Sequence, residues 1–232
     1  MKVILSGATG FIGGEVLHQA LAHPAITSLV CLTRRCLPEA ATSNPKLKVI
    51  TITDFLSYPP EILSQLEGAE SCIWAMGNPA HKAKSLEESR NVDIQYMLAA
   101  AEAFTNALAP PLKARGKTFR FVLLSGMLTC RDPHKTLWFM DTTRKMKGEA
   151  ENGLLALHEK RGSNLDLSIM RPGGVVAKNT LLPKFLVACT SSIKLDELAA
   201  VMIDEAVAGA NGTRTMECDV LRNRGRELLK GS

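Results

Sequence analysis

Apolar residues along the chain fall into short runs, separated by segments whose apolar positions recur at helical spacing. Val3-Ile4-Leu5 is typical of a buried strand, and residues 13–21 carry apolar side chains at positions that share one face of a helix. Similar patterns predict long helices that begin near Asn91 and Thr143. Further strands are predicted at residues 28–33, 47–52, 71–75, 119–124 and 165–170. Strands that alternate with helices predict an α/β fold with a mostly parallel sheet and helices on both faces.

Three glycines lie between the first predicted strand and the first predicted helix, at positions Gly7, Gly10 and Gly13. A glycine turn lets the backbone approach a pyrophosphate closely, and the free N–H groups and dipole of the following helix favour negative charge. We therefore predict that residues 7–13, which include Thr9, Phe11 and Ile12, bind a dinucleotide. The alternative is that these glycines only form a tight strand-to-helix turn.

Two arginines, Arg34 and Arg35, directly follow the second predicted strand. In a doubly wound Rossmann domain the end of this strand meets the adenosine ribose, where an acid selects NAD and an arginine accommodates the extra phosphate of NADP. The strand end carries no acid, so the sequence favours NADP(H) as cofactor, with NAD(H) possible. The alternative is that the two arginines belong to a solvated turn.

The ends of the next strands extend the predicted cofactor site. Ala75 ends the fourth strand, Met76 and Gly77 follow it, and ligands of open α/β sheets bind outside the carboxyl ends of strands. We therefore expect these residues to line the nicotinamide ribose. Asp54 and Phe55 follow the third strand, at the adenine side of the same edge.

Length and composition predict one domain that spans residues 1–232, with a small substrate-side region around residues 177–232. The net charge of +5 is spread among acidic residues, so no nucleic-acid partner is expected. The apolar runs are too short to cross a bilayer, and the N-terminal run is too short for a signal-peptide core. We expect a cytoplasmic protein that binds a small-molecule substrate and no membrane, as a monomer or a homodimer. The six cysteines have no metal-ligand spacing, so no metal is expected.

The segment Gly7-Ala-Thr-Gly-Phe-Ile-Gly13 resembles the glycine turn of extended and atypical short-chain dehydrogenase/reductases. From Lys2 to about Ala208 the chain is similar to NmrA-like and nucleoside-diphosphate-sugar-epimerase-like members of this group. The resemblance implies a Rossmann fold that binds NAD(P). Extended epimerases carry a larger C-terminal substrate domain, for which this chain has no room, so sugar-nucleotide chemistry is not expected.

The resemblance also implies roles for single residues. Asp54 matches an acid that meets the adenine amino group, although an aspartate after a strand is also a common turn residue. Asn91 matches an asparagine that supports the catalytic group through a water, although it also suits a helix N-cap. Ser125, at the end of the fifth strand, matches a serine that donates to the substrate carbonyl. The segment of Pro172, Gly173 and Val175 matches a loop that passes the nicotinamide carboxamide.

The family's catalytic tyrosine is absent from its expected place. Its motif is a tyrosine four residues before a lysine, and if Lys147 is that lysine, the tyrosine position holds Thr143. If Lys145 is chosen instead, the position holds Asp141. A threonine hydroxyl is too weak an acid to replace a phenol that a neighbouring lysine tunes towards neutral pH. Lys147 would still hold the cofactor ribose.

Three functions remain open on this evidence. The first is an NADP(H)-dependent oxidoreductase that acts on a small organic carbonyl or a conjugated ring. In it Ser125 would orient the oxygen, and Thr143 or a water would relay the proton. The second is an isomerase, cyclase or dehydratase that uses the same pocket without net redox chemistry. The third is an NmrA-like regulator that senses a dinucleotide and catalyses nothing. The missing tyrosine is the reason that the second and third functions stand beside the first.

Overall fold

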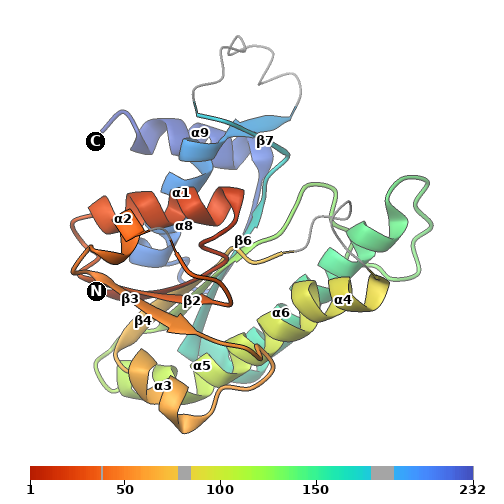
Figure 1. Ribbon diagram of the computed structural model, residues 1–232. Helices are drawn as coiled ribbons and strands as arrows, with labels where there is room; N and C mark the ends of the chain where they lie inside the picture. Colours follow the sequence, from red (N-terminus) through yellow and green to blue (C-terminus); the bar gives the residue numbers. More distant parts are fainter. Residues whose placement is uncertain (38, 78–84, 179–190, 232) are drawn as a thin grey trace.

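The computed structural model describes residues 1–37, 39–77, 85–178 and 191–231 (Figure 1). Within these residues seven parallel strands form one sheet in the order β3-β2-β1-β4-β5-β6-β9. Its strands are β1 (Lys2–Ser6), β2 (Ser28–Thr33), β3 (Leu47–Thr51), β4 (Ala69–Trp74), β5 (Phe119–Leu124), β6 (Leu165–Arg171) and β9 (Thr213–Glu217). The first six agree with the predicted strands to within two residues at either end. The predicted α/β class is confirmed.

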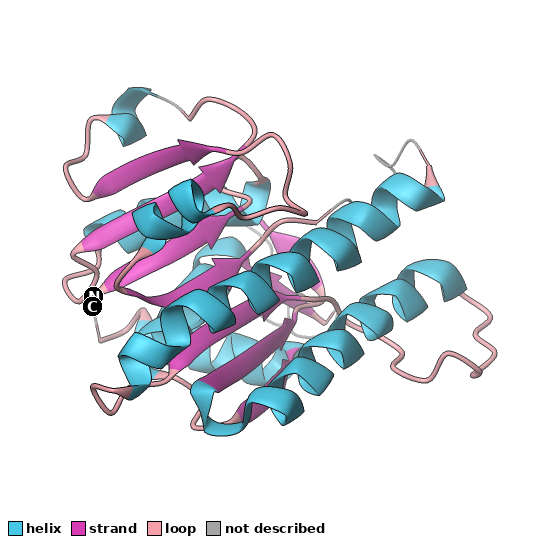
Figure 2. Ribbon diagram, turned by 90° about the horizontal axis from the view of Figure 1, so that it is seen from below, coloured by secondary structure: helices cyan, strands magenta, loops and turns pink. Residues whose placement is uncertain are grey.

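Helices cover both faces of this sheet (Figures 1 and 2). One layer holds α3 (Pro60–Leu66), α5 (Tyr96–Lys113) and α6 (Asp141–Arg161), and the other holds α1 (Phe11–Ala22), α8 (Leu195–Ala208) and α9 (Cys218–Leu228). The alternation of side chains along a strand supplies both cores. In β1, for example, Ile4 packs under the first layer, while Val3 and Leu5 pack under the second.

The order of the strands in the sheet determines where a ligand is expected to bind. The chain winds outwards from β1 to β3 and then crosses back to β4, which pairs with the other side of β1. Ligands of doubly wound sheets bind at this reversal, outside the carboxyl ends of the strands. The loops that follow β1 and β4 meet there closely, since a Cβ atom on Gly7 would lie 2.5 Å from the Ala75 carbonyl oxygen.

Several shorter elements were not predicted. Between β2 and β3 lies the single helical turn α2 (Glu39–Thr42). The polar segment before Asn91 contains α4 (Leu86–Arg90), which Ser85 caps by accepting a hydrogen bond from the Glu88 N–H. A π-helical segment, Asn91–Gln95, then joins α4 to α5. Short strands β7 (Gly174–Val176) and β8 (Ser192–Lys194) pair in parallel outside the main sheet.

The C-terminal part of the chain is built into the main domain. Helix α8 packs against α1, and β9 extends the sheet beside β6. Residues 179–190 lie outside the described residues, so the substrate-side role expected around 177–232 stays a prediction. Among the helices that the structure describes, none has the length and apolar character needed to span a membrane.

Candidate functional site

The turn after β1 is shaped for an anion. Gly10 donates its N–H to the Gly7 carbonyl at 2.9 Å, which closes the turn, and α1 begins at the next residue. Neither a side-chain cap nor an acidic residue satisfies the first turn of this 12-residue helix. Its N–H groups and positive dipole end are therefore available to a negatively charged group.

Gly7 and Gly13 are glycines for a different structural reason from Gly10. Gly7 has a φ of +78°, and a Cβ atom on Gly13 would lie 2.1 Å from the Gly7 carbonyl oxygen, so both are required by the fold. A Cβ atom on Gly10 would meet only that same oxygen, at 3.2 Å. Thr9, Gly10 and Phe11 are exposed around this space. The open space at Gly10, beside an uncapped helix end, fits the pyrophosphate of a dinucleotide.

The two arginines after β2 lie in solvent at the sheet edge. The Thr33 hydroxyl donates to the Arg35 carbonyl at 2.8 Å and accepts the Arg35 N–H at 3.0 Å, which fixes the turn. Arg34 and Arg35 are exposed, and neither forms an ion pair with any residue in the described ranges. Both guanidinium groups are thus available to a phosphate, and the preference for NADP stays a prediction.

The segment after β3 has a stronger structural role than expected. The Asp54 carboxylate accepts the Leu56 N–H at 2.8 Å, which is the turn interaction that was its alternative reading. The Phe55 ring is 1% exposed and packs against Trp74 and Tyr96. The Phe55 ring therefore belongs to the core, and the cofactor-binding roles of Asp54 and Phe55 stay predictions.

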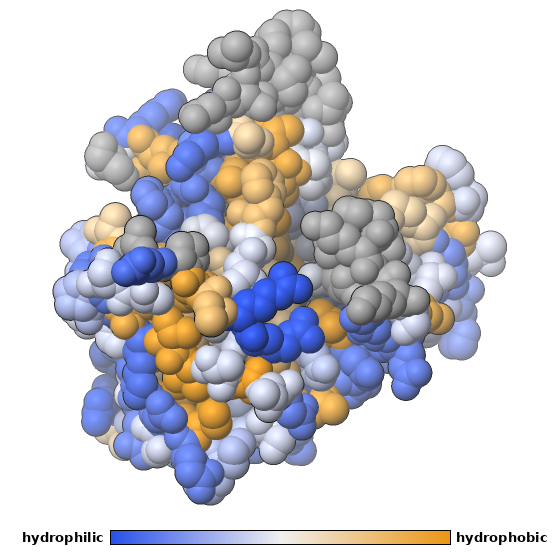
Figure 3. Space-filling view, viewed as in Figure 1, coloured by the Kyte–Doolittle hydropathy of each residue, from blue (hydrophilic) through white to orange (hydrophobic). Residues whose placement is uncertain are grey.

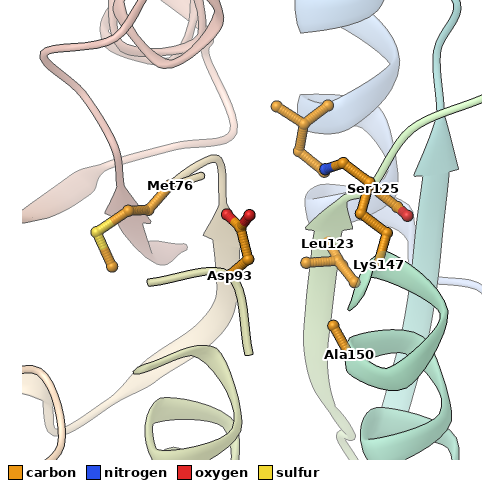
Figure 4. A pocket seen from close by; sticks show the side chains of 7 residues that line it. Met76, Asp93, Leu123, Ser125, Lys147 and Ala150 are labelled. Atoms are coloured by element: carbon orange, nitrogen blue, oxygen red, sulfur yellow. The ribbon is translucent and has the colours of Figure 1, made fainter. Parts of the chain in front are cut away.

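A pocket opens between the ends of β4 and β5 and the first half of α6 (Figure 4). Met76 and Asp93 lie on one side of it, and Ser125 and Lys147 lie on the other; the Asp93 carboxylate and the Lys147 nitrogen point towards the gap. The remaining lining residues are Leu123, Leu124 and Ala150. Ala75 and Gly77 flank Met76 at the end of β4. The structure thus brings three of the predicted site residues together: Met76, Ser125 and Lys147.

Lys147, not Lys145, reaches this pocket. Lys145 forms an ion pair with Asp141 at 2.9 Å, whereas Lys147 has no hydrogen bond or ion pair to a described residue. The stem of Lys147 lies along Gly126, where a Cβ atom would be 3.3 Å from Cδ and Cε. The next residue, Gly148, lets the preceding loop pack against α6, since a Cβ atom there would lie 1.8 Å from the Cys130 carbonyl oxygen.

No phenol lines the pocket within the described part of the chain. Thr143 lies one turn before Lys147 on α6 but is not a lining residue. The Tyr58 ring is buried against Phe104, and this burial raises the pKa of its phenol. The Tyr96 ring packs against Phe55. The two tyrosines of the chain are therefore both committed to the core.

Ser125 is tied to a buried carboxylate that sequence reasoning missed. Its hydroxyl donates to Glu151 at 2.6 Å, and Glu151 is fully buried. Glu151 also accepts hydrogen bonds from Arg171, at 2.5 and 2.9 Å, and from Arg131 at 2.7 Å. Burial raises the pKa of Glu151, but the hydrogen bonds from Arg171, Ser125 and Arg131 outweigh it and hold the pKa below its ordinary value. Because the hydroxyl hydrogen points at Glu151, Ser125 in this arrangement accepts from a substrate but does not donate to it.

The loop after β6, which contains Pro172 and Gly173, packs closely against its neighbours. Ser125 and Met127 donate their N–H groups to the carbonyls of Met170 and Pro172, both at 2.8 Å, so the loops after β5 and β6 run together. A Cβ atom on Gly173 would lie 1.7 Å from the Ser191 carbonyl oxygen. Val175 pairs with Ile193 in the short sheet. Contact of this loop with a nicotinamide stays a prediction.

Asn91 opens the π-helical segment, and its backbone is helical, with φ −60° and ψ −49°. The N-cap alternative is therefore wrong, because an N-cap residue has non-helical dihedral angles. Asn91 does not line the pocket, whereas Asp93, two residues later, does. Asp93 lies between the buried Val92 and Ile94, and a carboxylate between two apolar residues was the one sequence signal that could have singled it out.

Several proteins with different names are similar in sequence to this chain. The chain is 29% identical over 196 residues to the leucinostatins biosynthesis cluster protein T of Purpureocillium lilacinum, covering 84% of this chain and 65% of that protein. It is 27% identical over 227 residues to protein FMP52, mitochondrial, of Candida albicans, covering 91% of this chain and 90% of that protein. The first match thus spans less than two thirds of its relative.

Solved structures share the fold at low identity. The oxidoreductase ylbE from Lactococcus lactis has a TM-score of 0.66 and 18% identity, with 99% of this chain and 97% of that chain covered. MoeE5 in complex with UDP-glucose and NAD has a TM-score of 0.69 and 14% identity, with 99% and 82% covered. At this identity the likeness shows the fold alone.

The expectation of a cytoplasmic protein is contradicted. Matching proteins from Candida albicans, Emericella nidulans, Aspergillus clavatus and Lodderomyces elongisporus are all named mitochondrial. The expectation was wrong because it rested only on the lack of a long apolar run and of a signal-peptide core, and neither feature excludes an organelle.

The prediction of an NAD(P)-type cofactor is supported by comparison with a protein family. A family model described as NAD(P)H-binding matches residues 7–207, which begin at the first glycine of the turn and end in α8. The match includes the strand ends and the pocket that the sheet reversal creates. It does not distinguish NADP from NAD. With its glycine turn, its Rossmann sheet and this match, the chain belongs to the NAD(P)H-binding family.

Proposed function

We propose that this protein is an NADP(H)-dependent oxidoreductase that acts on a small organic carbonyl or a conjugated ring. The observation that carries the proposal is the pocket at the end of β5, where Ser125 and Lys147 lie opposite Met76. When bound, the dinucleotide supplies a hydride. The ammonium of Lys147 would hold the ribose and add positive field at an oxygen that gains negative charge.

The surface near the pocket supports an apolar substrate. The loop between β5 and α6 starts at the pocket and carries a group of exposed apolar side chains, visible at the right of Figure 3. Trp138 is 94% exposed, and its neighbours in this group are Met127, Leu128, Phe139 and Met140. Arg144 holds the loop by donating to the carbonyls of Leu128 and Phe139, at 2.6 and 3.2 Å. An apolar surface of this kind on a fixed loop favours a ring or chain over a sugar.

Turnover tests the proposal directly. Purified protein with NADPH is mixed with a panel of aliphatic and aromatic aldehydes, ketones and quinones, and absorbance of NADPH is followed. We expect loss of absorbance that depends on both the substrate and the protein. If no compound causes such a loss, the oxidoreductase proposal fails.

Cofactor preference is tested at Arg34. We expect Arg34→Ala to weaken NADPH binding roughly 10- to 100-fold and to leave NADH binding unchanged, since a charge-assisted hydrogen bond contributes about 1.5–3 kcal/mol. Calorimetric titration with both dinucleotides measures this. Arg115→Ala is the matched control, because Arg115 is also exposed but follows α5 at the opposite edge of the sheet. Equal NADPH affinity in Arg34→Ala and the native protein would contradict the preference.

A second function has one observation in its favour. The pocket holds a carboxylate and an ammonium, Asp93 and Lys147, and no phenol from the described residues. Such a pair suits an isomerase, cyclase or dehydratase, which moves protons without net redox change. Conversion of substrate while the total of reduced cofactor stays constant would favour this function over the first.

A further inference from the structure

Neither the glycine turn nor Lys147 explains how the oxygen of a reduced carbonyl would be protonated. Reduction of a carbonyl places negative charge on its oxygen, which must receive a proton. The family's usual donor is a tyrosine, and this chain has Thr143 in that place, outside the pocket. The described groups that line the pocket include a source for this proton, and the inference rests on the proposed function.

Among the lining residues that the structure describes, one candidate remains. Met76, Leu123, Leu124 and Ala150 carry no acidic hydrogen. The hydroxyl of Ser125 is committed to Glu151 at 2.6 Å, and in the proposed function the ammonium of Lys147 holds the cofactor ribose. The remaining lining residue is Asp93, a carboxyl group that gains and loses protons readily in water.

The position of Asp93 fits this task. Its carboxylate projects into the gap between the end of β4 and the Lys147 side of the pocket (Figure 4). Gly77 gives it room, because a Cβ atom there would lie 3.3 Å from the Asp93 Oδ1 atom. Asp93 belongs to the π-helical segment Asn91–Gln95, and such segments inside helices are frequently found at functional sites. A wider helical turn re-aims the side chains that follow it.

We propose that Asp93 is the catalytic acid and base of this pocket and takes the place of the absent tyrosine. In reduction, the carbonyl carbon receives the hydride, the C=O π bond breaks, and the oxygen takes the proton of the Asp93 carboxyl group. The products are an alcohol, the oxidised cofactor and the Asp93 carboxylate, which regains a proton from water. In the reverse direction the carboxylate accepts the alcohol proton. Lys147 lies across the pocket and stabilises the charge on the oxygen until the proton arrives.

This inference rests on the proposed function, but one of its consequences requires no turnover. The oxidised nicotinamide carries a positive charge that the reduced ring lacks. A carboxylate beside the ring therefore favours NADP⁺ over NADPH. We expect Asp93→Asn to weaken NADP⁺ binding about fivefold and to leave NADPH binding unchanged, when both are measured by calorimetry. Glu61→Gln makes the same chemical change on exposed α3, away from the pocket, and should alter neither affinity.

Turnover of the carbonyl panel is the second readout. We expect Asp93→Asn to lower kcat by about 100- to 10,000-fold, as loss of general acid–base catalysis does. Asp93→Glu keeps a carboxyl group and should retain measurable turnover, which separates lost chemistry from a disturbed helix. Thr143→Ala, which removes the alternative hydroxyl, should change kcat less than threefold.

The outcomes are decisive in combination. An unchanged ratio of NADP⁺ to NADPH affinity in Asp93→Asn would mean that Asp93 does not lie beside the nicotinamide, and the inference would be wrong. Full turnover in Asp93→Asn, or loss of turnover in Thr143→Ala with Asp93 intact, would also overturn it while leaving the oxidoreductase proposal standing. If the native protein reduces no compound, the proposed function fails, and the proton role of Asp93 fails with it.

Discussion

Alanine at Gly13 is expected to destabilise the protein by about 3 kcal/mol and to abolish measurable binding of NADPH. Its Cβ atom would lie 2.1 Å from the Gly7 carbonyl oxygen and 2.6 Å from the carbonyl carbon. Both atoms are backbone, so the clash cannot be relieved by rotating a side chain. Either the turn or α1 must move, and the N–H groups at the helix start lose their common direction.

Gly14 provides a matched control in the same helix. A Cβ atom on Gly14 would lie 3.6 Å from the Ala8 carbonyl oxygen, which is ordinary contact. Gly14→Ala is therefore expected to stabilise the protein by up to about 1 kcal/mol, because alanine is the better helix former. Urea denaturation and calorimetry with NADPH measure both variants. Equal stability of the two variants would contradict the packing that we describe at Gly13.

Glutamine at Glu151 is expected to lower the free energy of unfolding by about 3 kcal/mol. The carboxylate is fully buried and pairs with Arg171, whose side chain is 15% exposed, and with Arg131. Removing the charge leaves two guanidinium groups without their buried partner, and a neutral amide cannot accept their hydrogen bonds equally well. Ser125 also loses the acceptor of its hydroxyl hydrogen.

Glu217 is the control for this substitution. It pairs with the same Arg171 at 2.8 Å, but its side chain is 52% exposed. Water screens an exposed pair, so Glu217→Gln should cost no more than about 1 kcal/mol. A similar loss of stability in both variants would show that burial of Glu151 is not the cause of the effect.

The pH dependence of stability separates the charge of Glu151 from its shape. Its pKa in the folded protein is lowered, so the folded state binds the proton less well than the unfolded chain does. This contribution to stability is present above the ordinary glutamate pKa and is lost as the pH falls through the lower folded value. The difference in unfolding free energy between the native protein and Glu151→Gln should therefore shrink below about pH 4. A difference that stays constant from pH 7 to pH 3 would argue against an ionised carboxylate.

Much of the scaffold was predictable because its signals are local. Short apolar runs mark the central strands, which are buried between the two layers of helices, and β2 and β5 begin and end where the pattern predicted. Helix α4, which the sequence pattern did not predict, shows the limit of this reasoning. That segment has little apolar periodicity, and its helix depends on the Ser85 cap and on continuation into α5.

The site residues also fall into two groups, those that local sequence motifs predict and those that only the fold brings together. The sequence by itself predicted the glycine turn and the arginines after β2, because each lies at a fixed spacing beside one strand. The choice of Lys147 over Lys145 needed the structure. Only the tertiary structure decided which groups face one another. Asp93 reaches the pocket from a π-helical segment that no sequence spacing predicts. The Ser125 hydroxyl donates to Glu151, which also accepts hydrogen bonds from Arg131 and Arg171, each 20 residues away along the chain. Such contacts join β5, β6 and α6 only after the sheet has formed, so no local pattern in the chain can encode them.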